Sequence, residues 1–433
     1  MKQRGRWIFS CFGLIVLLVL PLAGINVHDT KMMAQPTITQ GKIAFVYAND
    51  LWICDWQGHN VRRLTSHPGI ESVPVFSPDG RWVAFSGEYD GNVDVYLVPA
   101  EGGLPRRLTW HPGADIVRGF TPDGQKVIFI STRNSFTRAH NKLFAVPLSG
   151  GMPEELPLPY VFKATFSPDG QKIAYVPLRE AFHQWKHYRG GTVSTIWIIR
   201  LSDLSVEKIP QPEGRCNDTD PMWVGDKIYF RSDRAGEFNL FVYETTTGKI
   251  TQLTHYDDFP VLSASAGAGR IVFERAGHLF LFNPDTRKAE RLTIGVAADL
   301  LELRPRYVQG EKYIRSGDLS PSGARAVFGF RGEIITVPAK KGDFRNLTNS
   351  PGAHDRFPVW SPDGSKIAYF SDASGEYKLY VIDQKGQGSP QSFALPGAGF
   401  YDSPVWSPDS PVSYTHLRAH ETRHDLVCRL LLE

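Results

Sequence analysis

Cysteine is scarce in this sequence, and the few that occur give little support to a disulfide. Only four are present in 433 residues. Cys11 lies in an N-terminal apolar segment and Cys428 in an atypical C-terminal tail. Cys54, within the run Leu-Trp-Ile-Cys, is interpreted as a small buried hydrophobic residue. A disulfide between Cys54 and Cys216 stays open, because an exported protein could form one.

Several catalytic signatures are also missing. No Gly-x-Ser-x-Gly motif occurs, so the nucleophile elbow of an α/β-hydrolase is not visible. No Gly-x-x-x-x-Gly-Lys loop is present to cradle a phosphate. No pair of carboxylates indicates glycosidase chemistry. We therefore expect no cofactor from these motifs.

The chain has no excess of charge of one sign. Its formal net charge is +3. Lys2, Arg4 and Arg6 account for all of it, so the rest of the chain sums to zero. A nucleic-acid-binding surface normally carries a marked basic excess. Nucleic acid is therefore not an expected partner.

A hairpin signature recurs along almost the whole chain. Its clearest copy, residues 359–372, reads VWSPDGSKIAYFSD. Pro presets φ at the first turn position and Gly accepts a positive φ, so the two flanking runs predict an antiparallel hairpin. Aromatic residues make up 12% of the chain, which also holds 40 Gly and 31 Pro. This composition is typical of many strands and turns.

One aromatic position in the second strand of each unit reveals the period of the repeat. Successive copies of this aromatic lie 40, 44, 46, 55 and 43 residues apart. Four strand-like runs per unit at this period indicate propeller blades, which must stack on their neighbours. The longest step contains residues 179–191, which we expect to form a loop on one face. The marker positions are Phe45, Phe85, Phe129, Tyr175, Phe230 and Phe273.

The predicted fold is all-β, with a six-bladed β-propeller over residues 41–309. The first unit lacks a run before Gly41, and the run RPRYV at residues 304–308 is expected to supply it and close the ring. After residue 309, a second series of repeat units begins. Residues 316–409 predict the first two to three blades of a second, seven-bladed propeller that is incomplete. A single ring of eight or nine blades is the alternative.

The first 34 residues predict a signal peptide. The three cations named above precede an apolar stretch whose core, residues 14–20, is too short for a membrane span. Cleavage is expected after Ala34 or near Ala23. We therefore expect an exported, periplasmic protein, with an uncleaved membrane anchor as the alternative.

Residues 411–433 break every pattern set before them. On a helix, the run HETRH would place His420, Glu421 and His424 in the H-E-x-x-H arrangement of zinc proteases. However, residues 412–432 resemble the conceptual translation of a transposase-type sequencing-library adapter. We interpret this tail as artefactual, and no metal site is expected. The biological sequence is then expected to stop near Asp409.

Residues 41–409 resemble the tricorn protease family. FSPDG and RRLT repeats are shared with TolB-type propellers and with prolyl oligopeptidases. The more specific feature is a six-unit run ending LELRPRYV, followed by SGDLSPSGARAVFGFRGEI. It looks like the junction between the six-bladed and seven-bladed propellers of tricorn homologues. The resemblance implies the non-catalytic propeller part of an S41-type serine peptidase, whose PDZ and catalytic domains are not present in this sequence.

The resemblance also implies a route for substrates. Family propellers guide or gate peptides, so peptides or unfolded protein segments are the expected partners; a homo-oligomer of the intact protein stays open. A basic pair in the six-bladed ring can hold a substrate's C-terminal carboxylate, as an Arg fork suits it. Arg138 matches this position best, although Ala139 and His140 follow it. A TolB-like periplasmic propeller that acts as a protein-binding scaffold is the alternative function.

The remaining polar residues that recur are interpreted as structural. An aspartate in each SPDG-type turn can accept hydrogen bonds from nearby turn N–H groups. Histidines at similar repeat positions are expected in blade loops rather than in a metal site. These residues are Asp79, Asp123, Asp169, Asp363, His111, His255 and His354.

Overall fold

The computed structural model describes residues 27–137, 140–300, 310–395 and 401–407, and the backbone of residues 413–417 and 426–430. These residues form strands and two short 3-10 turns, η1 (Ala181–His183) and η3 (Glu311–Tyr313). No helix in this part of the chain is long and apolar enough to cross a membrane. The chain divides into two compact units, Met1–Leu303 and Arg304–Glu433.

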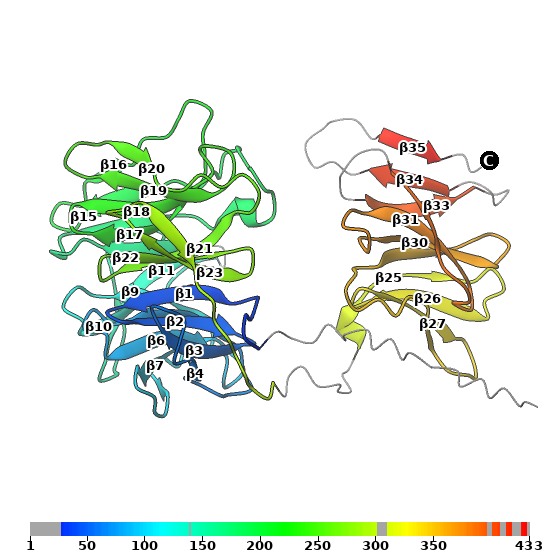
Figure 1. Cartoon of the computed structure of the whole chain (residues 1–433), viewed down its shortest axis with the longest axis horizontal. Coiled ribbons are helices and arrows are strands. Elements are labelled where there is room, and N and C mark those ends of the chain that lie inside the picture. Colours follow the sequence, from blue (N-terminus) through cyan, green and yellow to red (C-terminus); the bar gives the residue numbers. More distant parts are fainter. Residues whose placement is uncertain are drawn as a thin grey trace, which may run out of the picture. The chain divides into compact units, whose positions relative to one another are not determined.

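The first unit consists of six four-stranded antiparallel sheets, and each sheet is one continuous piece of chain (Figure 1, blue to green). The strands follow one another as a meander, from an inner first strand to a short outer fourth strand. Blades one to three comprise β1 (Ala34–Thr39), β2 (Lys42–Tyr47), β3 (Asp50–Asp55), β4 (Arg62–Arg63), β5 (Glu71–Phe76), β6 (Trp82–Gly87), β7 (Asp94–Pro99), β8 (Arg106–Arg107), β9 (Asp115–Phe120), β10 (Lys126–Ser131), β11 (Lys142–Pro147) and β12 (Glu154–Glu155).

Blades four to six continue the same order. They comprise β13 (Lys163–Phe166), β14 (Lys172–Val176), β15 (Trp197–Arg200), β16 (Val206–Lys208), β17 (Asp218–Val224), β18 (Lys227–Ser232), β19 (Asn239–Glu244), β20 (Ile250–Gln252), β21 (Val261–Gly267), β22 (Arg270–Arg275), β23 (His278–Asn283) and β24 (Lys288–Arg291).

The second strand of each blade is buried on both of its faces, because each sheet is covered by a neighbouring blade on either side. β10 reads KVIFIS and is buried from its second residue to its last. Continuous apolar runs of this kind are typical of doubly covered strands. The six predicted marker aromatics are all fully buried. Burial of one such ring contributes about 1.5–3 kcal/mol.

The six blades close into a ring. Inner strands contact in the order β1, β5, β9, β13, β17 and β21, and β1 also packs against β21 and β22. One hydrophobic cluster joins the first and last blades, with Phe45 of β2 against Val272 of β22 and Leu279 of β23. This closure confirms a six-bladed ring and contradicts a single ring of eight or nine blades.

The closing strand is not the one predicted from the sequence. β1, residues 34–39, pairs with β2 and supplies the run that was thought to be missing before Gly41. The prediction that residues 304–308 fill this place is therefore wrong. Residues 30–33, which fall within the predicted signal peptide, also contact the ring. The Thr30 amide donates to the Ile294 carbonyl at 2.8 Å.

The repeated SPDG turn has the predicted structure. In the copy before β30, the Gly364 amide donates to the Ser361 carbonyl at 2.8 Å. Gly364 has φ +72°, in the left-handed region that favours glycine. The Asp363 carboxylate accepts from the Ser361 hydroxyl at 2.5 Å and from the Ser365 amide at 3.0 Å. These bonds hold the pKa of Asp363 down at about 2.

The second unit contains three sheets that stack as an open series. β25 packs on β29, and β29 packs on β33. β25 is mostly exposed, unlike the inner strands of the ring. The strands are β25 (Ile314–Leu319), β26 (Arg325–Phe330), β27 (Glu333–Pro338), β28 (Arg345–Asn346), β29 (Arg356–Trp360), β30 (Lys366–Ser371), β31 (Lys378–Asp383), β32 (Gln391–Phe393), β33 (Tyr401–Trp406), β34 (Ser413–Leu417) and β35 (Leu426–Leu430).

Candidate functional site in the channel of the ring

The inner strands of the ring surround a cavity of about 820 Å³. Each of the six blades contributes residues from its first strand to the cavity lining. Much of the lining is apolar and rich in proline, including Pro74, Pro221 and Leu262. The cavity therefore lies where the first strands of all six blades meet.

β-Bulges shape the wall of this cavity. The pairing register shifts by one residue within five of the six inner strands, all except β13. Val73 of β5 and Asp220 of β17 sit in these bulges with φ of 51° and 48°. Such backbone is uncommon outside glycine, and bulges are a recognised means of redirecting side chains. Both residues line the cavity.

A three-residue ion network lies on the wall formed by blades four and five. The Asp220 carboxylate is 2.7 Å from Lys163 Nζ of β13 and 2.6 Å from Arg231 Nε of β18. Arg231 is buried and also donates to the Val261 carbonyl at 2.8 Å. Burial would raise the pKa of Asp220, but the two cations prevail and hold it well below its usual range. The network therefore stays charged. Through the hydrogen bond from Arg231 to the Val261 carbonyl, it joins blades four, five and six.

Arg118 of β9 is the next basic residue in the lining. It donates to the Val117 carbonyl at 2.8 Å and to the Phe162 carbonyl, and its guanidinium lies 5.4 Å from the centre of the Phe162 ring. Among the described residues, no carboxylate forms an ion pair with it. Burial lowers the pKa of Arg118 to about 10, while Glu180 and Asp220 act in the opposite direction. Arg118 remains a cation at neutral pH.

Glu274 of β22 is an acidic residue in the lining. Its carboxylate accepts from the Gln35 amide at 3.1 Å and from the Ser263 hydroxyl at 2.7 Å. In the described part of the chain, no lysine or arginine forms an ion pair with it. Glu274 therefore places an acidic side chain on the wall of blade six.

The predicted insertion lies between β14 and β15 and reaches over blade five. It contains η1, where Phe182 packs on Phe238 with ring centres 4.6 Å apart. His183 lies 2.7 Å from the buried Glu180 carboxylate and contributes to the cavity lining. The loop prediction is confirmed, and the insertion also forms part of the cavity wall.

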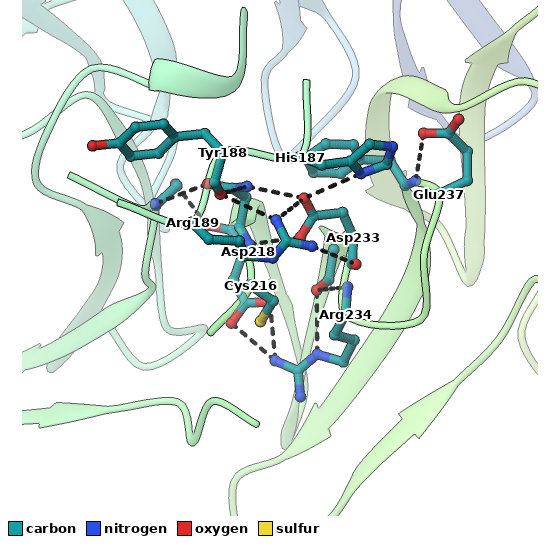
Figure 2. A network of polar contacts seen from close by, with 12 residues as sticks. His187, Tyr188, Arg189, Cys216, Asp218, Asp233, Arg234 and Glu237 are labelled. Atoms are coloured by element: carbon teal, nitrogen blue, oxygen red, sulfur yellow. Dashed lines mark hydrogen bonds and ion pairs between the residues drawn. The ribbon is translucent and has the colours of Figure 1, made fainter. Parts of the chain in front are cut away.

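Figure 2 shows the polar network that holds this insertion in place. Arg189 of the insertion pairs with Asp233 at 2.6 Å, and Asp233 also accepts from the Asn217 amide at 2.7 Å. Beside it, Arg234 donates to both oxygens of the buried Asp218 at 2.9 Å (Figure 2). The Arg189–Asp233 pair ties the insertion to blade five, and the Arg234–Asp218 pair lies within that blade.

The residues proposed for chemistry from the sequence lie outside the described residues. Arg138 falls between residues 137 and 140, and His420, Glu421 and His424 fall between β34 and β35. Neither the carboxylate-binding role of Arg138 nor the artefactual origin of the tail is tested here. No group of three His, Cys, Asp or Glu residues in the described ranges is placed to hold a metal ion.

The residues interpreted as structural lie where the repeat predicts them. The aspartates of the four SPDG-type turns each accept a hydroxyl and a backbone amide, and the three repeat histidines lie in connections between blades. Cys54 and Cys216 are both buried, free thiols. Burial raises the pKa of each to about 12.

Sequence reasoning missed the charges in the channel. A signal was available, because Arg118 lies two residues before an aromatic near the end of its strand, while Lys163 and Asp220 lie three residues before theirs. Charged residues at this place in three successive inner strands are unusual in a buried ring. Their partners could not be read from the sequence, since Arg231 comes from a second strand.

Comparison with known proteins supports the same architecture. The family model described as the tricorn protease N-terminal beta propeller domain matches residues 30–288. Tricorn protease homolog 1 of Streptomyces coelicolor is 29% identical over 348 residues, covering 79% of this chain and 32% of that protein. A tricorn protease homolog of Saccharolobus solfataricus is 26% identical over 368 residues, covering 84% of this chain and 33% of that protein.

The fold agrees with a solved structure. The crystal structure of the tricorn protease superposes with a TM-score of 0.57 at 21% identity, covering 89% of this chain and 46% of that one. The chain spans about a third of the length of the two relatives named above. On the match to the family model, over more than half of its residues, the chain belongs to the tricorn protease family through its N-terminal β-propeller.

Proposed function

We propose that this chain is the propeller part of a tricorn-like serine peptidase, and that its ring guides or gates peptides on their way to or from a catalytic domain of the intact protein. The observation that carries this proposal is the cavity at the centre of a closed ring in a member of this family. A wall with apolar and charged groups suits an extended peptide, which presents side chains of both kinds.

Photocrosslinking tests the proposal. The full chain is irradiated with a ten-residue peptide that carries a photoreactive phenylalanine, and the crosslinked residues are mapped by mass spectrometry. We expect crosslinks to the lining of the cavity, such as Val73 and Leu262. A Thr165→Trp variant, which places a bulky ring in the channel, should reduce them severalfold.

The control is Thr251→Trp on the outer strand β20, which adds the same ring away from the cavity. It should leave the crosslinks unchanged. Crosslinks that lie only on the outer surface, or that Thr165→Trp does not affect, would count against passage of peptides through the ring. A folded protein captured on the outer surface would instead favour a scaffold.

A further inference from the structure

The charges around the cavity do not all neutralise one another. Six titratable residues line it, and four of them are paired. Lys163 and Arg231 share Asp220, and His183 lies against Glu180. The remaining two are Arg118 and Glu274, for which no ion pair forms among the described residues. One cation and one anion are therefore left with only neutral hydrogen-bond partners.

These two groups lie on opposite walls. Arg118 belongs to blade three and Glu274 to blade six. In a closed ring of six blades, the third and the sixth blades face each other across the axis. Because both residues line the same cavity, their charges present opposite signs across it.

We infer that the channel binds a short zwitterionic peptide, with its C-terminal carboxylate at Arg118 and its N-terminal ammonium group at Glu274. This inference rests on the proposed function, since it needs peptides to enter the ring. It adds a preference for peptides with both ends free.

The chemistry of both ends fits the two walls. An arginine guanidinium binds a carboxylate through charge-assisted hydrogen bonds. Among the described residues, the side-chain hydrogen bonds that Arg118 donates go to backbone carbonyls. A peptide's α-amino group is largely protonated near neutral pH, and an unpaired carboxylate is its natural acceptor. Each charge would gain a partner that the ring does not supply, so the site should favour the zwitterion over either blocked form.

A cycle of blocked peptides and variants tests this arrangement. Trialanine is prepared free, N-acetylated, C-amidated and blocked at both ends, with dialanine and tetraalanine to find the best length. Binding to the full chain is measured by ligand-detected NMR near neutral pH. For the original protein, each block should weaken binding by about tenfold, as expected for loss of a charge-assisted hydrogen bond.

Each variant should remove one preference and keep the other. With Arg118→Gln, amidation should no longer matter, while N-acetylation should still weaken binding by about tenfold. With Glu274→Gln, the pattern should reverse. Because each variant keeps one preference, a loss of folding cannot imitate the result. Arg200→Gln, an exposed cation on β15, is the control and should leave all four affinities unchanged.

Three outcomes would overturn the inference. Equal binding of all four forms would show that the ends are not recognised, and peptide entry would still stand if the crosslinks lie in the channel. Persistence of both preferences in Arg118→Gln and Glu274→Gln would place the binding site elsewhere. Absence of binding by every form, with no crosslinks in the channel, would remove the proposed function together with the inference.

Discussion

Glu71, at the start of β5, is a carboxyl group that the junction of the first two blades buries completely. It accepts from the Leu51 amide at 2.9 Å and from the hydroxyl groups of Thr65 and Tyr89. Burial outweighs these hydrogen bonds and raises the pKa of Glu71 to about 7, with a further contribution from the nearby Asp50. The folded state therefore holds this proton more firmly than the unfolded chain does.

This single group should make the ring less stable as the pH rises. The ordinary pKa of the group is 4.5, so its contribution is fully present below that pH and is lost between there and about pH 7. Glu71→Gln should remove about 1–3 kcal/mol of this pH dependence. Urea unfolding midpoints at pH 5 and pH 8 measure it. The exposed Glu290→Gln is the control, and an unchanged slope in Glu71→Gln would refute the assignment.

Single residues also show which features a sequence can reveal. The roles of Asp363 and Gly364 could be predicted, because the hydrogen-bond partners within a turn lie only two or three residues apart in the sequence. The pairing of Asp220 with Lys163 was not, because it joins separate blades whose register depends on bulges. Residues that act within one turn can be inferred locally, whereas residues that meet at the axis need the assembled ring.

At the scale of elements, the segment before β1 latches the first blade to the last. Val296 donates its amide to the Thr30 hydroxyl at 2.9 Å, and the Met32 amide donates to the Gly277 carbonyl at 2.8 Å. Asp29 pairs with Arg291 at 2.9 Å. Met33 is fully buried in the cluster between these blades, while Met32 is 78% exposed.

Two adjacent methionines provide a matched test of this latch. Met33→Ala should lower the free energy of unfolding by about 2–5 kcal/mol, because it leaves a cavity between the first and last blades. Met32→Ala should change it by no more than about 0.5 kcal/mol. Denaturant unfolding of both variants measures the difference. Equal effects would mean that the segment does not contribute to closure.

The latch also bears on where a leader could be removed. Cleavage after Ala34 would delete Met33 and the hydrogen bonds of Thr30, whereas cleavage near Ala23 would keep them. A chain that begins at residue 27 should therefore be more stable than one that begins at residue 35. β1 escaped detection because its sequence, AQPTIT, contains a proline at a bulge and no aromatic residue.

At the scale of the whole molecule, the two units differ in how completely they cover their strands. The ring leaves no inner strand without a neighbour. In the second unit, β25 shows the burial pattern of an uncovered strand, and Leu319 is 69% exposed. Uncovered sheet faces and open edges favour association between molecules.

When the two units are produced as separate proteins, they should therefore differ in folding and in association. Residues 27–300 alone should fold and keep the unfolding midpoint that the ring has in the full chain, because all six contacts between neighbouring blades lie within them. Residues 310–433 alone should associate. Calorimetry and light scattering measure the two outcomes. A ring that unfolds at a markedly lower temperature when isolated would contradict its independence.

The latch has a consequence for the order of events during synthesis. Thr30 and Val296, which it joins, are 266 residues apart in the chain. At the usual pace of translation, roughly 10 to 50 seconds separate their appearance at the ribosome. Throughout that interval the flank of blade one that carries Phe45 has no sixth blade to cover it. The nascent protein must therefore carry an exposed apolar surface until its last blade emerges, and this interval is when a chaperone would have most to bind.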